Sequence, residues 1–217
     1  MIGPRTRGLL ALLLVLVAAL AWLAYEVAND RTIQFDLALR DAIHQHASPP
    51  LTRFMKLVTF IGRLYSVLPL AAGVIVVLWR TGLKREAWVL AFVMAGEVPI
   101  EQVLKWAIHR PRPSPFFSYA LPSSYSFPSG HALASVLLFG TLAALLAPHI
   151  RGKSNKLLLW LAAALMIAAI GFSRVYLGVH YPTDVIAGYA AGLAWVLTVW
   201  SVRSSGAGIL SNAPHDS

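Results

Sequence analysis

Apolar runs of about 20 residues recur along the whole chain, and they constrain its fold more than any other feature. Each run can cross a hydrocarbon core about 30 Å thick as a helix, which satisfies its own backbone hydrogen bonds in lipid. The 217 residues are 58% hydrophobic and 12% charged, whereas soluble domains are about 45–50% apolar and about 25% charged. No composition break or low-complexity tract divides the sequence. We therefore expect one all-α integral membrane domain over residues 1–217.

Hydropathy predicts a bundle of six transmembrane helices. The expected spans are 8–27, 58–79, 87–108, 130–148, 157–172 and 183–202. Arg5 and Arg7 before the first run would suit a secretory signal. The run is longer than a signal core of about 7–15 residues, so we expect an uncleaved first helix.

An amphipathic helix is expected between the first and second spans. One face carries Phe35, Leu39, Ala42 and Ile43, and the opposite face carries Asp36, Arg40, Asp41 and His44. This spacing is typical of a helix that lies in the membrane interface.

Basic residues in short loops predict the orientation. They are Arg5, Arg7, Arg80, Lys84, Arg85, Arg151, Lys153, Lys156 and Arg203. With six spans all of them fall on one side, which should be the cytoplasmic side of a plasma (inner) membrane, together with both termini. The formal charge of +9 would suggest a nucleic acid partner for a soluble protein. Here much of the charge serves topology, and no nucleic acid partner is expected.

The opposite, extracytoplasmic side then receives the connections 28–57, 109–129 and 173–182. Cysteine is absent, which excludes a disulfide framework and a thiolate metal site. Gly188 and Gly192 form a G-x-x-x-G pattern in the last span, which favours close packing of another helix of the same chain over a dimer contact.

Two polar clusters lie on the connection 109–129 and its flanks. Lys105 and Arg112 are seven residues apart, so a helix that breaks at the following prolines would direct both towards one place. An ordinary basic membrane boundary is the alternative, although it would lie on the wrong side. Ser129, Gly130 and His131 open the fourth span, where backbone N–H groups could bind an anion. Ser129 could instead be a plain N-cap, and His131 a structural residue or a metal ligand.

The third cluster is the connection before the last span. His180 and Asp184 are four apart and would share a helix face if the helix began by Tyr181. A carboxylate that accepts the Nδ1–H of an imidazole fixes its tautomer and leaves Nε2 free to attack. Arg174 offers planar donors suited to phosphate oxygens. A surface His–Asp pair at a helix start is the alternative.

Taken together, the clusters suit displacement at phosphorus. This reaction needs cations around the phosphoryl oxygens, a nucleophile in line and an acid for the leaving oxygen.

The clusters resemble the three-part motif of the type-2 phosphatidic acid phosphatase superfamily. The matching residues are Lys105, Arg112, Pro113, Pro128, Ser129, Gly130, His131, Ser173, Arg174, His180 and Asp184. The superfamily includes lipid phosphate phosphatases, bacterial undecaprenyl-diphosphate and phosphatidylglycerophosphate phosphatases, and vanadium haloperoxidases. The resemblance covers 105–184, and the six-helix frame is similar to the membrane-bound branch.

The resemblance implies a role for each residue. His180 would be the nucleophile that forms a phosphohistidine, Asp184 would orient it, and His131 would protonate the leaving oxygen and then activate water. The implied phosphate-binding residues are Lys105, Arg112, Ser129, Gly130 and Arg174. Neither a metal nor another cofactor is implied.

Two features lie outside the motif. Glu97 and Glu101 share a helix face with Lys105, and we interpret them as compensating its charge, with a role in holding Lys105 back from the site as the alternative. The aromatic segment 114–126 suits a lid or lipid-facing lip and an interfacial aromatic belt equally well.

We therefore expect a membrane phosphatase that hydrolyses phosphomonoester or diphosphate groups of lipids drawn from the bilayer. Candidates are undecaprenyl diphosphate, phosphatidate and phosphatidylglycerophosphate. The competing hypotheses are a lipid phosphotransferase with the same phosphohistidine step and a non-catalytic binder or transporter of anionic lipids. A haloperoxidase is disfavoured because those relatives are soluble. The sequence leaves the oligomeric state open.

Overall fold

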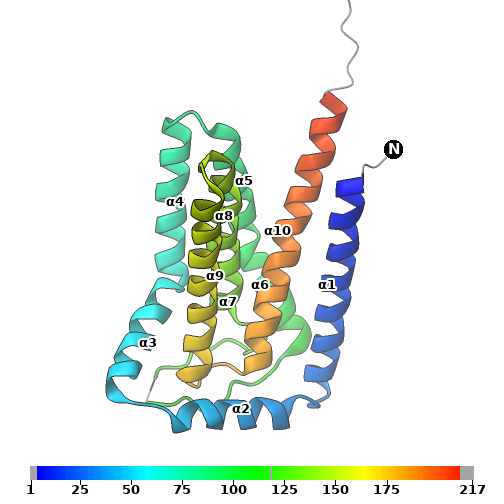
Figure 1. Cartoon of the computed structure of the whole chain (residues 1–217). Helices are drawn as coiled ribbons and strands as arrows, with labels where there is room; N and C mark the ends of the chain where they lie inside the picture. The colour runs from blue at the N-terminus through cyan, green and yellow to red at the C-terminus, as the bar shows by residue number, and fades with distance from the viewer. Residues whose placement is uncertain (1–3, 118, 211–217) are drawn as a thin grey trace, which may run out of the picture.

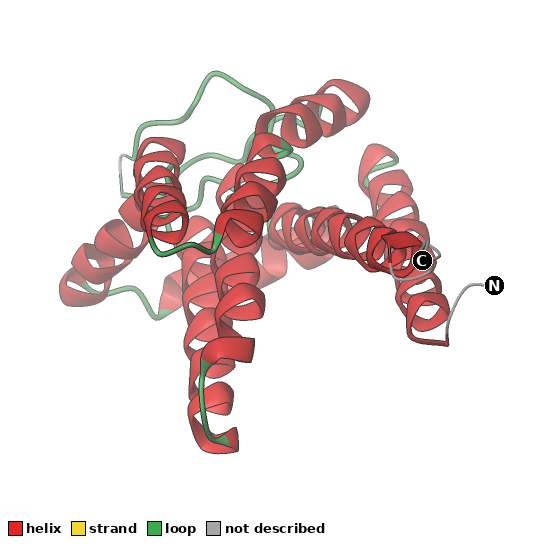
Figure 2. Ribbon diagram, turned by 90° about the horizontal axis from the view of Figure 1, so that it is seen from above, coloured by secondary structure: helices red, strands yellow, loops and turns green. Residues whose placement is uncertain are grey.

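The fold consists of helices joined by loops (Figures 1 and 2). It is taken from a computed structural model that describes residues 4–117 and 119–210, with side chains from Arg7 to Val202. No strand occurs in these ranges. The first half comprises α1 (Pro4–Ala28), α2 (Ile33–Gln45), α3 (Pro49–Ile61), α4 (Leu64–Arg80), α5 (Lys84–Ala95) and α6 (Glu97–Ile108). The second half comprises α7 (Gly130–Ser135), a π-helical segment (Val136–Gly140), α8 (Thr141–Leu146), a 3₁₀ turn (Ala147–His149), α9 (Lys153–Tyr176) and α10 (Pro182–Leu210).

Within the described residues, five helical segments are long and apolar enough to cross a membrane. They are Arg7–Ala28, Lys84–Ile108, Gly130–His149, Lys153–Tyr176 and Pro182–Val202. A sixth span is obtained if α3 and α4, which meet at an angle of 52°, count as one. The all-helical membrane bundle is thus confirmed, and the count is five or six.

The second predicted span differs most from the structure. The span predicted over 58–79 is broken in the structure, because the chain bends at Gly62 and Arg63 between α3 and α4. Pro49 and Pro50 are the first residues of α3. Proline is tolerated in the first turn of a helix because backbone N–H groups there have no partner within the helix. Residues 49–57, expected in a connection, are therefore helical.

The main apolar core lies where α4, α5, α10 and the span opened by α7 meet. Its fully buried members include Val67, Leu90, Val93, Leu133, Leu137 and Leu138. Gly188 and Gly192 of α10 contribute to this contact. A Cβ on Gly188 would lie 2.6 Å from the carbonyl oxygen of Ser129, and one on Gly192 would lie 2.9 Å from Cβ of Val136. The predicted internal packing of this pattern is confirmed.

The expected amphipathic helix is α2, which runs across one end of the bundle (Figure 1). Its polar face is directed inwards, since Asp36 and Arg40 are buried while Phe35 and Leu39 are exposed. This arrangement leaves apolar side chains facing outwards, as a helix in a membrane interface requires. Its position in the interface remains a prediction.

The two ends of the bundle differ in their connections. The α4–α5 turn and the turn before α9 lie at the end where α1 begins and α10 ends (Figure 1). The long loop 109–129 and the connection 177–181 lie at the other end, beside α2. Two of the predicted polar clusters are thus brought to one end of the bundle, and the third adjoins them. The side chains of Arg5 and Arg203 fall outside the described set.

Candidate active site

The three predicted clusters meet in one cavity of about 470 Å³. The predicted site residues that line it are Lys105, Arg112, Gly130, His131, Arg174 and His180. Ser129 and Asp184 are fully buried behind this lining. Segments up to 79 positions apart thus supply one site.

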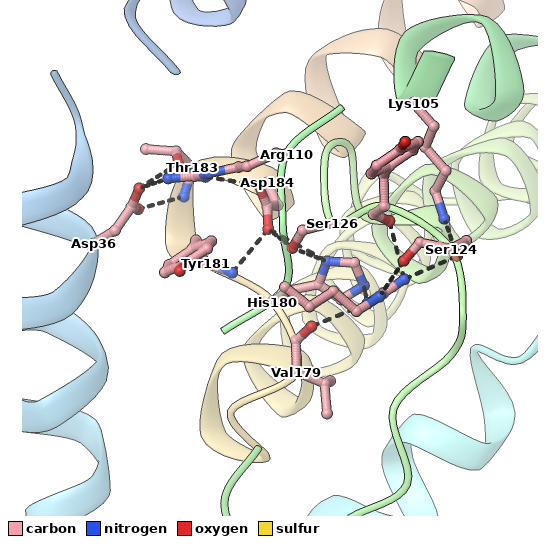
Figure 3. A network of polar contacts seen from close by, with 12 residues as sticks. Asp36, Lys105, Arg110, Ser124, Ser126, Val179, His180, Tyr181, Thr183 and Asp184 are labelled. Atoms are coloured by element: carbon pink, nitrogen blue, oxygen red, sulfur yellow. Dashed lines mark hydrogen bonds and ion pairs between the residues drawn. The ribbon is translucent and has the colours of Figure 1, made fainter. Parts of the chain in front are cut away.

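His180 and Asp184 are in contact although they do not share a helix. The last helix begins at Pro182, one residue later than the helical-face prediction required, so His180 lies in the preceding turn. The Nδ1 atom of His180 lies 3.4 Å from Oδ2 of Asp184. The backbone N–H of Tyr181 donates to the same oxygen at 2.9 Å, and the hydroxyl of Ser126 donates to it as well (Figure 3). The carboxylate is therefore fixed by the turn that carries His180.

The hydrogen bonds of His180 define its tautomer. Nη1 of Arg112 lies 3.0 Å from Nε2 of His180, and a guanidinium can only donate. Nε2 therefore carries the lone pair, and Nδ1 carries the hydrogen directed at Asp184. Burial lowers the pKa of His180 to about 3; the hydrogen bond to Asp184 opposes this effect and the charge of Arg112 adds to it. The imidazole is thus neutral at neutral pH, as a nucleophile must be.

Asp184 is also tied to α2 through Arg110. Nη1 of Arg110 donates to Oδ1 of Asp184 at 2.7 Å, and Nη2 donates to Oδ2 of Asp36 at 2.6 Å (Figure 3). Thr183 donates to Asp36 through both its backbone N–H (3.0 Å) and its hydroxyl (2.7 Å). Burial alone would lower the pKa of Arg110, but the two carboxylates raise it. The guanidinium is therefore charged, and it links two carboxylates from different helices.

Lys105 and Arg112 converge on Ser124, as their spacing predicted. Lys105 lies in α6, which ends at Ile108, and Arg112 follows in the loop. Nζ of Lys105 donates to the hydroxyl of Ser124 at 2.8 Å, and Nε of Arg112 donates to its carbonyl at 2.7 Å. Burial lowers the pKa of Arg112, while Asp184 and Glu101 oppose the shift. Two cations thus face one side of the cavity.

The predicted charge compensation of Lys105 is confirmed for Glu101. Its Oε1 lies 2.8 Å from Nζ of Lys105. The same carboxylate lies close to Gly130, where a Cβ would come within 2.4 Å of Oε1. Glu97 is buried beside it and lines the same cavity. A negative group therefore already occupies the place beside the predicted phosphate-binding glycine.

Ser129 and His131 lie at the start of the span opened by α7. Ser129 stands at the N-cap position, yet its hydroxyl makes no capping hydrogen bond. Its Oγ and Nε2 of His131 have no hydrogen-bond partner among the described residues, although both are buried. These polar atoms are suited to a polar ligand, because buried polar groups are normally paired.

Arg174 lies in the last turn of α9 and is 2% exposed. Nη1 donates to the hydroxyl of Thr59 in α3, and the guanidinium lies 5.8 Å from the ring centre of Tyr119. None of the ion pairs between described residues involves Arg174. An unpaired buried cation is costly, which favours a site for an anion.

The loop 114–126 forms a wall of the cavity. Phe116 stacks on His44 of α2 with 3.8 Å between ring centres, and Phe117 stacks on Tyr176 of α9 at 5.4 Å. Residues 119–122 and Ser124 line the cavity. Ser118 lies outside the described residues. The segment is thus packed onto the protein at the cavity, and the lid or lip and the aromatic belt both stay predictions.

Several residues of the site were missed by sequence reasoning. They are Asp36, Arg63, Arg110, Tyr119, Ser124 and Ser126. Their contacts depend on how loops and the α3–α4 break fold, which no periodic pattern reports. The one signal available in the sequence was the ionisable face of the helix over 33–45, because ionisable groups near a membrane usually pair inwards.

The site can be compared with known proteins. A family model described as PAP2 superfamily matches residues 86–205. Phosphatidylglycerophosphatase B of Bacillus subtilis is 31% identical over 186 residues, which cover 83% of this chain and 85% of the relative. Undecaprenyl-diphosphatase of Sulfolobus acidocaldarius is 30% identical over 190 residues, which cover 85% and 86%.

A solved structure also matches the fold. It is the crystal structure of a transmembrane PAP2-type phosphatidylglycerolphosphate phosphatase from Bacillus subtilis, with a TM-score of 0.82 and 27% identity. The match covers 89% of this chain and 96% of that one. The family model spans more than half of the sequence and includes every residue of the three motif segments. The chain therefore belongs to the PAP2 superfamily.

Proposed function

We propose that this protein is a lipid phosphatase that cleaves phosphomonoester or diphosphate groups through a phosphohistidine at His180. One observation carries the proposal. A neutral imidazole, oriented by Asp184 and hydrogen-bonded at Nε2 by Arg112, lines a cavity with a second histidine and further cations. This set contains the nucleophile, the acid and the charge stabilisation that phosphoryl transfer requires.

The chemistry divides between the two histidines. Nε2 of His180 forms a bond to phosphorus as the bond from phosphorus to the lipid oxygen breaks. His131 donates a proton to that oxygen, which leaves as a lipid alcohol or a lipid monophosphate. His131 then takes a proton from water, whose oxygen attacks the phosphohistidine; the N–P bond breaks and inorganic phosphate leaves. Asp184 stabilises the charge that develops on the imidazole.

The phosphoryl oxygens are assigned to Lys105, Arg112 and Arg174, with the hydroxyl of Ser129 and the backbone at Gly130. The lack of a partner for Ser129 Oγ and for Arg174 Nε supports this assignment. The carboxylate of Glu101 must then move away from Gly130 when a phosphate binds, because two anions would repel at that distance. Lys105 would exchange Glu101 for the phosphate.

The substrates are proposed from the relatives. Those relatives are named for phosphatidylglycerophosphate and undecaprenyl diphosphate, and both are lipids with a phosphorylated headgroup. The lipid chain would stay in the bilayer while the headgroup enters the cavity beside α2 from the extracytoplasmic side of a plasma membrane. No metal is required by this mechanism, so activity should persist in EDTA.

Release of inorganic phosphate from radiolabelled lipid phosphates by purified protein tests the proposal. We expect His180→Ala to lower the rate by at least about 1,000-fold, since removal of a nucleophile abolishes the covalent route. His46→Ala, an exposed histidine at the end of α2, is the control and should retain activity. Acid-labile, alkali-stable label on the wild-type protein should be absent from His180→Ala.

Three outcomes would contradict the proposal. An unchanged rate in His180→Ala would exclude the phosphohistidine. Tight binding of lipid phosphates without phosphate release would indicate a non-catalytic binder. Label that moves to a second lipid in preference to water would indicate a phosphotransferase.

A further inference from the structure

The break between α3 and α4 brings an additional arginine into the cavity. Gly62 ends α3 and packs directly on the site, since a Cβ there would lie 3.2 Å from Cδ2 of His131 and 2.5 Å from Ile170. Arg63 follows in an extended conformation and lines the cavity. A side chain at position 62 would displace Ile170, so glycine allows this close approach, and the bend brings Arg63 into the same cavity as the proposed acid, His131.

Arg63 is held by Tyr119 of the loop 114–126, which also lines the cavity. Its Nη2 donates to the phenol oxygen of Tyr119 at 2.7 Å, and the ring of Tyr119 lies 5.8 Å from the guanidinium of Arg174. Burial would raise the pKa of Tyr119, but Arg63 and Arg174 lower it. The phenol therefore lies between two positive charges, next to the proposed phosphate site.

The charge of Arg63 has no carboxylate to balance it. None of the ion pairs between described residues involves Arg63. The other side of the cavity differs, because there Lys105 is paired with Glu101 at 2.8 Å. A half-buried arginine with free donors and no anion is suited to an anionic part of a ligand, because its planar donors match two phosphate oxygens at once.

The cavity is larger than one phosphoryl group requires. Its volume is about 470 Å³, whereas a water molecule occupies roughly 30 Å³ in the liquid and a phosphoryl group has only one phosphorus and three oxygen atoms. Lys105, Arg112 and Arg174 are assigned to the group under attack. Arg63 is not assigned to that group. It follows Gly62, which packs on the ring of His131, and His131 is the proposed acid for the leaving oxygen, so Arg63 is available to the part of the substrate that leaves.

We propose that Arg63 and Tyr119 form a subsite for a second phosphoryl group of the substrate, located on the leaving-group side of His131. This inference rests on the proposed function and defines its substrate class. Lipids with two phosphoryl groups in the headgroup would react in preference to lipids with one. The second group can be the inner phosphate of a prenyl diphosphate or the phosphodiester of a phosphorylated glycerophospholipid, which share the same anionic oxygens.

The subsite contributes to the reaction through charge. When the bond from the terminal phosphorus to the bridging oxygen of a diphosphate breaks, negative charge develops on that oxygen until His131 protonates it, and the inner phosphate leaves as a monophosphate. Arg63 would stabilise that charge as it develops, in addition to binding the ground state.

The test compares specificity constants for four substrates in the same detergent micelles. They are a prenyl diphosphate, the matching prenyl monophosphate, phosphatidylglycerophosphate and phosphatidate. In Arg63→Gln we expect kcat/KM for at least one two-phosphate substrate to fall by about 10- to 100-fold, the range for loss of a hydrogen bond to a charged group. The fold-decrease in kcat/KM for the one-phosphate substrates should be at least five times smaller than that for the two-phosphate substrate. Tyr119→Phe should shift the ratio in the same direction to a smaller extent.

The control variant is Arg53→Gln, which removes an exposed arginine from α3 and should leave the ratio unchanged. A loss confined to the prenyl diphosphate identifies the inner phosphate as the occupant, and a loss confined to phosphatidylglycerophosphate identifies the phosphodiester. Inhibition by inorganic pyrophosphate should weaken in Arg63→Gln more than inhibition by inorganic phosphate.

Equal losses for one-phosphate and two-phosphate substrates would overturn the inference and leave the proposed function intact. Absence of lipid phosphate hydrolysis by the wild type would instead overturn the proposed function. Because the readout is a ratio within one protein preparation, a partly misfolded variant cannot imitate the expected result.

Discussion

Arg110 joins two fully buried carboxylates that lie on different helices. It bonds Asp36 of α2 at 2.6 Å and Asp184 of α10 at 2.7 Å. Removal of one member of a buried charge network leaves the others unpaired, at a cost of about 3–5 kcal/mol. Since Asp184 orients His180, Arg110 is a positioning residue for the proposed nucleophile.

We therefore expect Arg110→Met to lower both the melting temperature and kcat, with a smaller change in KM, because the phosphate-binding side chains stay in place. Arg110→Lys should recover part of kcat, since it keeps the charge but cannot reach both carboxylates as a guanidinium does. Thermal unfolding and steady-state kinetics in detergent measure these effects.

Arg31→Met is the matched control. Arg31 is paired with Glu26 at 3.2 Å and its side chain is 55% exposed, so its loss should cost at most about 1 kcal/mol. If Arg110→Met leaves kcat unchanged, or if kcat and KM respond to it as they do to Arg31→Met, the positioning role is wrong.

At the residue level the sequence could predict the motif but not its supports. The motif residues include ionisable side chains beside apolar spans, so Lys105, Arg112 and His180 can be recognised in the sequence. Nothing in the sequence distinguishes Ser126 from other serines, and only the fold of the loop brings its hydroxyl to Asp184. Asp36 has the appearance of a solvated residue on a polar helix face until α2 turns that face inwards.

At the level of elements, the close contact of α10 with the span opened by α7 supports the site. Gly188 allows it, since a Cβ there would lie 2.6 Å from the carbonyl oxygen of Ser129 and 2.9 Å from Cβ of Ala132. Backbone atoms cannot yield as a flexible side chain can. Any side chain at this position must therefore push the start of α7 away from α10, and Ser129 with it.

We expect Gly188→Ala to destabilise the protein and to lower activity. Overpacking costs about 1–3 kcal/mol, which corresponds to a decrease in melting temperature of roughly 2–10 °C for a chain of this size. Thermal unfolding and phosphate release measure the two effects.

Gly73→Ala in α4 provides the comparison, because a Cβ at Gly73 would meet no atom within 4 Å. Alanine is favoured over glycine in a helix by about 1 kcal/mol, so this variant should be as stable as the wild type or more stable. Equal behaviour of the two variants would contradict the close-packing argument.

Span boundaries could be predicted from the sequence where the apolar runs are continuous, as in the first and fourth spans. The break between α3 and α4 could not, because a hydropathy window averages over a bend and the apolar residues continue on both sides of Gly62 and Arg63. The bend depends on the packing of Gly62 against His131 and Ile170, which is a tertiary contact. The helix α3 was missed for a related reason, since Arg53 and Lys56 interrupt its apolar pattern.

At the level of the whole molecule, the basic residues of the short turns and the site lie at opposite ends. Arg80, Lys84 and Lys153 adjoin the turns at the end where α1 begins (Figure 1). The loop 109–129 and the connection before α10, which supply cavity residues such as Arg112, Ser124 and His180, lie at the other end. The tendency of basic loops to remain cytoplasmic then predicts an extracytoplasmic active site. The turns and the site are placed by the same set of helices, so five spans and six spans give the same orientation.

Single cysteines test this orientation, since the chain has no cysteine of its own. Ser123 is exposed on the loop of the cavity wall, and Ser154 is exposed at the start of α9 at the opposite end. We expect a membrane-impermeant thiol reagent to label Ser123→Cys in intact cells and to label Ser154→Cys only after the membrane is permeabilised. Both variants should hydrolyse lipid phosphates at the wild-type rate, which shows that each is folded. The reverse labelling pattern would place the phosphatase site in the cytoplasm, where it would act on lipids of the inner leaflet.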